Sequence, residues 1–181
     1  MTKFVGLFFL LLITASSFAS SALKVGDKAP YFSLKNQNNQ RFELASQKNK
    51  GWTVLFFYPK AGTPGCTTEV CAFRDAIKEV TAKDAKVYGI SVDSVSAQKK
   101  FYDEHKLVFD LLADEKAEIT KKFGVKMPAL DMAQRTTFIL NPNLEVAWIE
   151  EDVDPAVDAK KVAKALGELQ ANVQKNPKIK K

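Results

Sequence analysis

The sequence has 181 residues, of which 46% are hydrophobic and 27% are charged. This composition is typical of one globular domain with a sizeable core, and it excludes a disordered or collagen-like chain. The formal net charge is +6, and the two cysteines are Cys66 and Cys71. The charge suggests a nucleic-acid or membrane interaction, whereas the cysteines suggest redox or metal chemistry.

The first segment has the layout of a secretory signal peptide. Lys3 precedes a largely apolar stretch over residues 4–15, and small, polar residues follow over 16–22. The apolar stretch is shorter than the ~20 residues that a membrane span needs. Cleavage after Ala19 fits the small residues there, although Ser21 or Ala22 would also serve. We predict a signal peptide over residues 1–21 and an exported protein; the alternative is a buried N-terminal helix.

The basic charge lies mostly in a lysine-rich tail, residues 175–181. Without Lys3 and the four lysines of this tail, 22 basic residues face 21 acidic ones. The rest of the chain has no basic stripe with interleaved aromatic residues, so we expect no nucleic-acid partner and no stable membrane association. No repeat or linker divides residues 22–174, which are predicted to form one domain.

The first predicted element is a hairpin, because apolar and polar residues alternate over 31–34 and 41–44 on either side of residues 36–39. Residues 53–59 form a continuous apolar run that ends at Pro59 and predicts a central strand covered on both faces. Thr63 as a cap and Pro64 in the first turn then begin a helix, whose apolar residues continue at helical spacing to Val80.

Residues 86–93 predict a second buried strand, after which Ser94 caps a helix that runs toward His105. A short strand over 109–112 and a helix over 115–123, ended by Gly124, follow. Residues 136–142 and 144–151 predict an antiparallel pair. The last helix follows Pro155 and extends to about residue 174, with these residues on its apolar side: Val157, Val162, Ala165, Leu166 and Leu169.

This order of elements predicts an α/β protein with the thioredoxin fold. We expect a central mixed sheet with helices on both faces and an N-terminal β-hairpin.

Cys66 falls in the first turn of the helix that follows the central strand. Backbone N–H groups and the helix dipole favour a thiolate there and lower the pKa of a cysteine at such a position. Ligands of open α/β sheets also bind at this edge of the sheet. Thr63 offers a hydroxyl near the sulfur, Pro59 and Pro64 stiffen the loop, and Gly65 allows a small substrate to approach the backbone.

Cys71 lies five residues after Cys66. On a continuous helix their Cα atoms are roughly 8–9 Å apart, whereas a disulfide needs at most about 7 Å. A strained structural disulfide, a redox pair that joins after local unwinding and a metal site are the alternatives. A metal site is incomplete, because two cysteines and His105 supply fewer than four ligands. Copper-carrying thioredoxin-like proteins also differ, since they have Cys-x3-Cys and a histidine later in the chain. We therefore interpret His105 as a helix-end residue.

Pro59, Thr63 and Cys66 match the P-x3-T-x2-C signature of the peroxiredoxins. Residues 57–75 resemble the bacterioferritin comigratory protein type, also called peroxiredoxin Q, and the likeness extends from Gly26 through Arg135 to the last helix. The resemblance implies a thiol peroxidase without a bound cofactor. Cys66 would attack hydrogen peroxide or a small organic hydroperoxide and become a sulfenic acid.

The resemblance also implies roles for other residues. Cys71 matches the resolving cysteine of some members, so an intramolecular Cys66–Cys71 disulfide would form and be reduced by an external, thioredoxin-like dithiol. Arg135 would hold the thiolate and the peroxide oxygens, for which a guanidinium fork suits better than lysine. Glu69 would orient Arg135. For Arg74, a site role and a surface ion pair are equally open.

Two features depart from the family pattern. Residues 36–39 replace the usual Asp-Gly hairpin turn, which alters only that turn. Export is the larger departure, because many relatives are cytoplasmic; it implies the bacterial periplasm and a thioredoxin-like or membrane-fed donor there. A monomer is expected because the second sulfur is in the same chain.

Two other function classes are possible. One is an exported thiol-disulfide oxidoreductase on the same fold, which would normally have Cys-x2-Cys. The other is a non-enzymatic metal carrier or redox-regulated binding protein.

Overall fold

The structure is a computed structural model that describes residues 22–175. The predicted signal peptide over residues 1–21 lies outside the described residues. The predicted tail starts at Lys175, which is the last residue of helix α4 (Asp158–Lys175), and residues 176–181 lie outside the described part.

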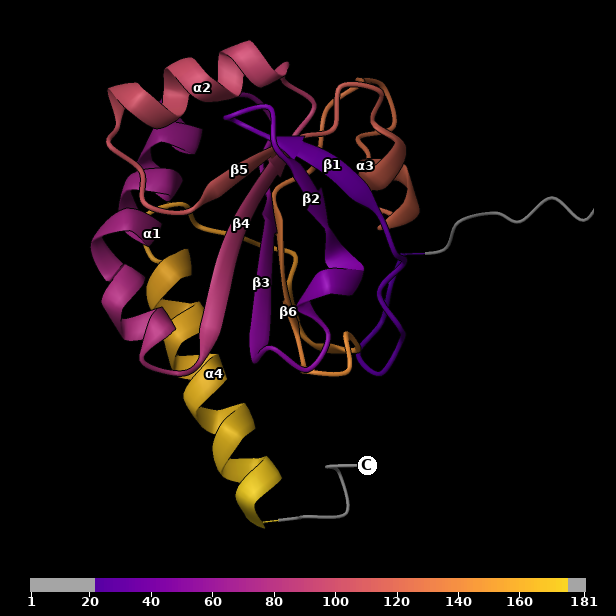
Figure 1. Ribbon diagram of the computed structural model, residues 1–181, viewed down its shortest axis with the longest axis vertical. Coiled ribbons are helices and arrows are strands. Elements are labelled where there is room, and N and C mark those ends of the chain that lie inside the picture. Colours follow the sequence, from indigo (N-terminus) through magenta and orange to yellow (C-terminus); the bar gives the residue numbers. More distant parts are fainter. Residues whose placement is uncertain (1–21, 176–181) are drawn as a thin grey trace, which may run out of the picture.

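A seven-stranded mixed sheet forms the centre of the fold (Figure 1), with the strand order β2-β1-β5-β4-β3-β6-β7. Strands β3 and β4 are parallel, as are β4 and β5, and the remaining neighbours are antiparallel. The strands are β1 (Ser33–Asn36), β2 (Arg41–Glu43), β3 (Trp52–Phe57), β4 (Ala85–Ser91), β5 (Asp110–Ala113), β6 (Thr136–Leu140) and β7 (Val146–Glu150).

Helices cover both faces of this sheet (Figure 1). Helices α1 (Pro64–Thr81), α2 (Val95–Glu104) and α4 contribute buried residues to one face. Helix α3 (Glu118–Lys122) and the 3-10 helix η1 (Leu44–Gln47) contribute to the other. The predicted mixed sheet, its helices on both faces and the N-terminal hairpin β1–β2 are therefore confirmed.

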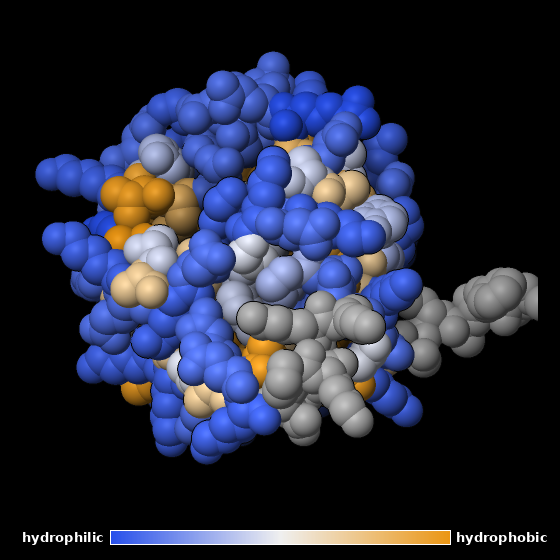
Figure 2. Space-filling view, turned by 60° about the horizontal axis from the view of Figure 1, so that its bottom comes forward, coloured by the Kyte–Doolittle hydropathy of each residue, from blue (hydrophilic) through white to orange (hydrophobic). Residues whose placement is uncertain are grey.

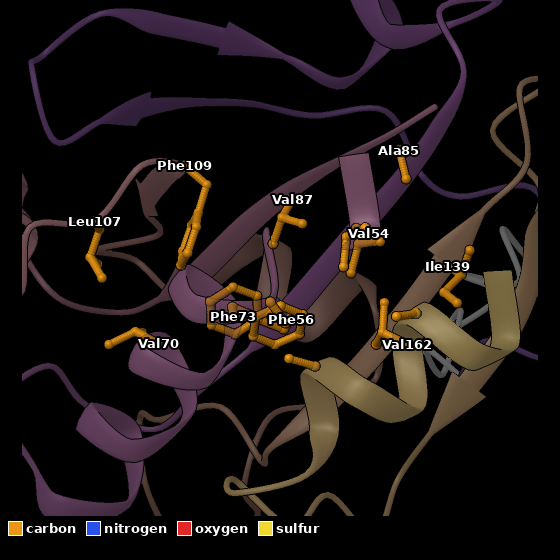
Figure 3. Close-up of a cluster of buried hydrophobic side chains, with 14 of the residues drawn as sticks. Val54, Phe56, Val70, Phe73, Ala85, Val87, Leu107, Phe109, Ile139 and Val162 are labelled. Atoms are coloured by element: carbon orange, nitrogen blue, oxygen red, sulfur yellow. The ribbon is translucent and has the colours of Figure 1, made fainter. Parts of the chain in front are cut away.

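Every residue of β3 is buried, because successive side chains enter different core clusters. Val54 and Phe56 point toward α1 and α4, as Figure 3 shows, whereas Leu55 and Phe57 enter the opposite cluster. The rings of Phe56 and Phe73 stack with centroids 4.5 Å apart. Each buried side chain of this size stabilises the fold by about 1.5–3 kcal/mol, so this packing fixes α1 against the end of β3.

The predicted helix over 115–123 is shorter in the structure, where α3 spans Glu118–Lys122. Ala117 has a left-handed backbone (φ 53°) that cannot continue a helix. The Asp114 carboxylate instead accepts the backbone N–H groups of Ile119 and Thr120, which caps the helix three residues later than predicted.

The prediction that Val157 lies on the apolar side of the last helix is wrong. Helix α4 begins only at Asp158, and Val157 is exposed in the preceding turn. Val162, Ala165 and Leu166 are buried as predicted, and Asp158 and Ala159 are also buried at the start of the helix.

Most of the face in Figure 2 is hydrophilic, and hydrophobic residues form small, separate patches on it. Among residues 22–175, no helix combines the length and the apolar character that crossing a membrane requires.

Candidate active site

Cys66 is buried in the first turn of α1, directly after the loop that leaves β3. Thr63 has an extended backbone (φ −82°, ψ 151°) and Pro64 is the first helical residue, so the helix starts abruptly at this point. In a first turn the backbone N–H groups have no partner within the helix, and together with the helix dipole they favour an anionic sulfur.

Arg135 lies beside the Cys66 sulfur because of the strand register. Phe57 at the end of β3 pairs with Thr136 at the start of β6, so Arg135 is placed next to the loop that leads into α1. Its Nη2 donates a hydrogen bond to Cys66 Sγ at 3.5 Å. Its Nη1 forms an ion pair with Glu69 Oε2, one turn along α1 from the cysteine.

The Arg135–Glu69 pair is buried on the Glu69 side. Burial raises the pKa of Glu69 to about 8, and although Arg135 opposes this rise, the nearby Asp158 adds to it. Burial also disfavours the charge of Arg135, but the Glu69 carboxylate and the Cys66 sulfur raise the pKa of Arg135, so the guanidinium stays charged. A fixed cation therefore contacts the sulfur in a largely dry site.

Gly65 is the residue against which Arg135 packs. A Cβ atom at Gly65 would lie 3.3 Å from Arg135 Nη2 and 3.9 Å from Cγ of Pro155. The absent side chain thus makes room for the guanidinium, in addition to any room it makes for a substrate.

The predicted helix start is confirmed, with Thr63 as the cap residue and Pro64 in the first turn, but the Thr63 hydroxyl does not cap α1. Thr63 occupies the N-cap position, but its Oγ1 donates to the backbone oxygen of Lys60 at 3.0 Å and accepts no N–H group of the helix. This bond closes the loop between Lys60 and Thr63 on itself. Pro59, half-buried, begins this loop directly after the fully buried Tyr58.

A buried polar network holds the same loop from the side of β4 and α2. Asp93 Oδ2 accepts the Ala61 N–H at 2.7 Å and the Ser91 hydroxyl at 2.7 Å. Gln98 Nε2 donates to Ser91 Oγ at 2.8 Å, and its Oε1 accepts the hydroxyl of Tyr58. Burial raises the pKa of Tyr58 well above its usual range, so the hydroxyl stays protonated as a donor.

Cys71 lies on the same unbroken helix as Cys66, and both thiols are free. Cys71 is half-buried and lines a hollow of about 480 Å³ between α1 and the start of α4. The two sulfurs therefore occupy different environments, one in the core beside Arg135 and one at this hollow.

Arg74 forms a surface ion pair with Asp75 at 2.8 Å, which is one of the two roles that the sequence left open for it. Its Nη1 also donates to the backbone oxygen of His105 at 2.8 Å. His105 is the residue that ends α2, and its ring packs edge-on against Phe101. In the described range, 22–175, no three His, Cys, Asp or Glu side chains are grouped so that they could hold a metal ion.

The sequence prediction did not include two acidic residues near the site, Asp93 and Asp158. Asp158 Oδ2 accepts the hydroxyl of Thr137 at 2.7 Å, and Asp158 is completely buried. A signal for Asp158 exists in the sequence, because it lies four residues before Val162 and thus on the apolar stripe of its helix. Asp93 gives no comparable signal, since it follows a strand in a loop.

Comparison with known proteins gives a consistent result. The AhpC/TSA family matches residues 25–149. The putative peroxiredoxin bcp of Coxiella burnetii is 34% identical over 141 residues, which cover 74% of this chain and 93% of that protein.

Solved structures show the same similarity. The structure of peroxidoxin BcpB from Mycobacterium tuberculosis superposes with a TM-score of 0.76 at 35% identity, covering 81% of this chain and 97% of that one. The bacterioferritin comigratory protein of Xanthomonas campestris, whose structure is described in terms of alkyl peroxide reduction, gives a TM-score of 0.71 at 29% identity and covers 76% and 90%.

Proposed function

The chain belongs to the AhpC/TSA family, as a peroxiredoxin of the Bcp/Q type, and we propose that it reduces hydrogen peroxide and small organic hydroperoxides through Cys66. The observation that carries this proposal is the contact of 3.5 Å between Cys66 Sγ and Arg135 Nη2 at the start of α1. The alkyl peroxide activity named for the Xanthomonas protein supports organic hydroperoxides as substrates.

In the proposed first step, the Cys66 thiolate attacks the outer oxygen of the peroxide. The S–O bond forms as the O–O bond breaks, and the leaving oxygen takes up a proton to become water or an alcohol. Arg135 is placed to stabilise both the thiolate and the negative charge that develops on the oxygens. Glu69 keeps Arg135 in this orientation through the buried ion pair.

In the second step, the Cys71 thiol attacks the sulfenic sulfur of Cys66, releases water and forms an intramolecular disulfide. The helix between the cysteines is intact in this structure, so residues 66–71 have to unwind before the sulfurs meet. Unwinding also removes Glu69 from its buried pair with Arg135. The half-buried position of Cys71 at a hollow supports its availability for this step.

The disulfide is then reduced by an external dithiol of the thioredoxin-like class. The signal layout of residues 1–21 supports export, and a periplasmic chain would draw electrons from a dithiol donor in that compartment. A monomer suffices for this cycle, because both sulfurs belong to one chain.

The test is the reaction of the reduced protein with one equivalent of hydrogen peroxide. Wild type should consume the peroxide, whereas Cys66→Ser should not. Cys71→Ser should consume it and stop at a sulfenic acid that dimedone traps. Peroxide consumption by Cys66→Ser at the wild-type rate would refute the assignment of Cys66, and a disulfide cycle without peroxide would favour the thiol-disulfide oxidoreductase instead.

A further inference from the structure

A second buried carboxylate, that of Asp158, interacts electrostatically with both members of the Arg135–Glu69 pair. Asp158 is the first residue of α4 and is completely buried. One of its oxygens accepts the hydroxyl of Thr137 at 2.7 Å, and the other has no partner. Thr137 lies two residues after Arg135, a spacing that puts both side chains on the same face of an extended chain.

Glu69 is also incompletely hydrogen-bonded, because its Oε1 is buried without a partner. Three groups that can carry negative charge therefore lie around the guanidinium of Arg135: Cys66 and Glu69 contact it, and Asp158 interacts with it electrostatically. A buried carboxylate that is ionised and incompletely hydrogen-bonded is strongly unfavourable. One cation cannot compensate three such anions, so the two carboxylates are expected to retain a proton between them.

The charged groups around Asp158 come from four elements. Arg135 before β6 lowers the pKa of Asp158, whereas Glu150 on β7 raises it. Lys161, one turn along α4, lowers it, but Lys161 and Glu150 pair with each other at 2.9 Å and so compensate. Glu69 on α1 is the remaining acidic neighbour, and its own pKa is raised by Asp158. The charge next to Arg135 therefore depends on the Glu69–Asp158 pair.

We propose that Asp158 is a positioning residue of the peroxidase site, and that it and Glu69 form a buried carboxylate pair that shares one proton and sets the negative charge beside Arg135. This inference rests on the proposed function, in which Arg135 holds the Cys66 thiolate. When Asp158 is ionised, Arg135 is shared between more anions and holds the thiolate less firmly. When Asp158 is neutral, more of the positive charge of Arg135 acts on the sulfur.

Burial raises the pKa of Asp158 to about 6 and that of Glu69 to about 8. Both shifts agree with one proton that the two carboxylates retain between them at neutral pH. They also predict that the influence of Asp158 on Cys66 begins near pH 6 and is absent in more acidic solution.

The experiment measures alkylation of Cys66 by iodoacetamide as a function of pH, in a Cys71→Ser background so that one thiol reacts. Asp158→Asn keeps the size of the side chain and an acceptor for Thr137 but removes the charge. We expect its alkylation curve to move to lower pH by about half a unit to one unit, a three- to tenfold higher rate at intermediate pH. In acid, where Asp158 is already protonated in the parent, the two rates should converge.

Two further variants make the result decisive. Thr137→Val removes the hydrogen bond that favours the ionised form of Asp158, so it should shift the curve in the same direction by a smaller amount, even if Asp158→Asn does not fold. Asp114→Asn is the matched control, because Asp114 is also a buried carboxylate that receives hydrogen bonds, at the start of α3. It should lower stability without moving the curve.

Superimposable curves for Asp158→Asn and its parent would overturn the proposal, and so would an equal shift in Asp114→Asn. No peroxide is used in this experiment, so its outcome is independent of the test of the peroxidase function.

Discussion

Gly65→Ala is a substitution for which the structure predicts opposite effects on stability and on activity. Gly65 is the second residue of α1, with an ordinary helical backbone that alanine can adopt. The added methyl group would lie 3.3 Å from Arg135 Nη2, closer than side-chain carbons normally approach such an atom. Arg135 must then retreat from the position in which it donates to Cys66 Sγ at 3.5 Å.

The two magnitudes follow from different contacts. Alanine is favoured over glycine in a helix by up to about 1 kcal/mol, and by less near the helix end, so stability should rise by about 0.5 kcal/mol or stay unchanged. A hydrogen bond to a charged group contributes about 1.5–3 kcal/mol. Weakening it by about 1.4 kcal/mol slows a reaction tenfold, so we expect peroxide reduction to fall about tenfold.

The assay combines stopped-flow measurement of peroxide reduction with urea unfolding. Gly167→Ala in α4 is the matched control, because a Cβ there would meet only Lys83, at an ordinary distance of 3.7 Å. Because Gly167 lies in the helix interior, its substitution should give an equal or larger gain in stability with an unchanged reduction rate. If Gly65→Ala reduces peroxide as fast as wild type while folding normally, the contact between Arg135 and the sulfur does not control the reaction.

Three further predictions concern the same site. Burial raises the pKa of Glu69 from its ordinary value of 4.5 to about 8, so the folded protein retains a proton that the unfolded chain releases, and the resulting stability, complete below pH 4.5, is lost as the pH rises to 8. Urea unfolding should show a loss of up to about 5 kcal/mol over this range in wild type and a flatter profile in Glu69→Gln. Asp93→Ala removes the acceptor of the Ala61 N–H group, so we expect slower peroxide reduction and a free energy of unfolding that is lower by about 1–3 kcal/mol. A wild-type rate of peroxide reduction would show that this hydrogen bond does not position the loop. Tyr58→Phe leaves Gln98 Oε1 buried without its donor, so unfolding should become easier by about 1–3 kcal/mol; an unchanged urea midpoint would contradict this network.

Hydrophobic periodicity was sufficient to predict most of the fold. The run over 53–59 indicated a doubly covered strand, and β3 is buried throughout. The predictions failed where a single polar contact decides the local structure. Asp114 delays the start of α3 through two backbone hydrogen bonds, and nothing in the local pattern distinguishes it from other acidic residues.

The site, like the fold, was predictable only where local sequence rules decide the structure. The location of Cys66 follows from local rules for a helix start, whereas its contact with Arg135 depends on the register of β6 against β3, which a single sequence does not specify. The burial of Glu69 and Asp158 was detectable only as two acidic residues on apolar helix stripes. Their shared relation to Arg135 requires the packing of α1, α4 and β6 together.

The most direct test of the account is the intact mass of the reduced protein after one equivalent of hydrogen peroxide, with peptide mapping of the product. Wild type should lose two hydrogen atoms and yield one peptide pair joined through Cys66 and Cys71. Cys71→Ser should instead gain one oxygen atom on Cys66, and Cys66→Ser should keep its mass. An oxidised Cys71 beside an unmodified Cys66, or an oxidised Cys66→Ser protein, would contradict the central claim that Cys66 reacts first and Cys71 resolves it.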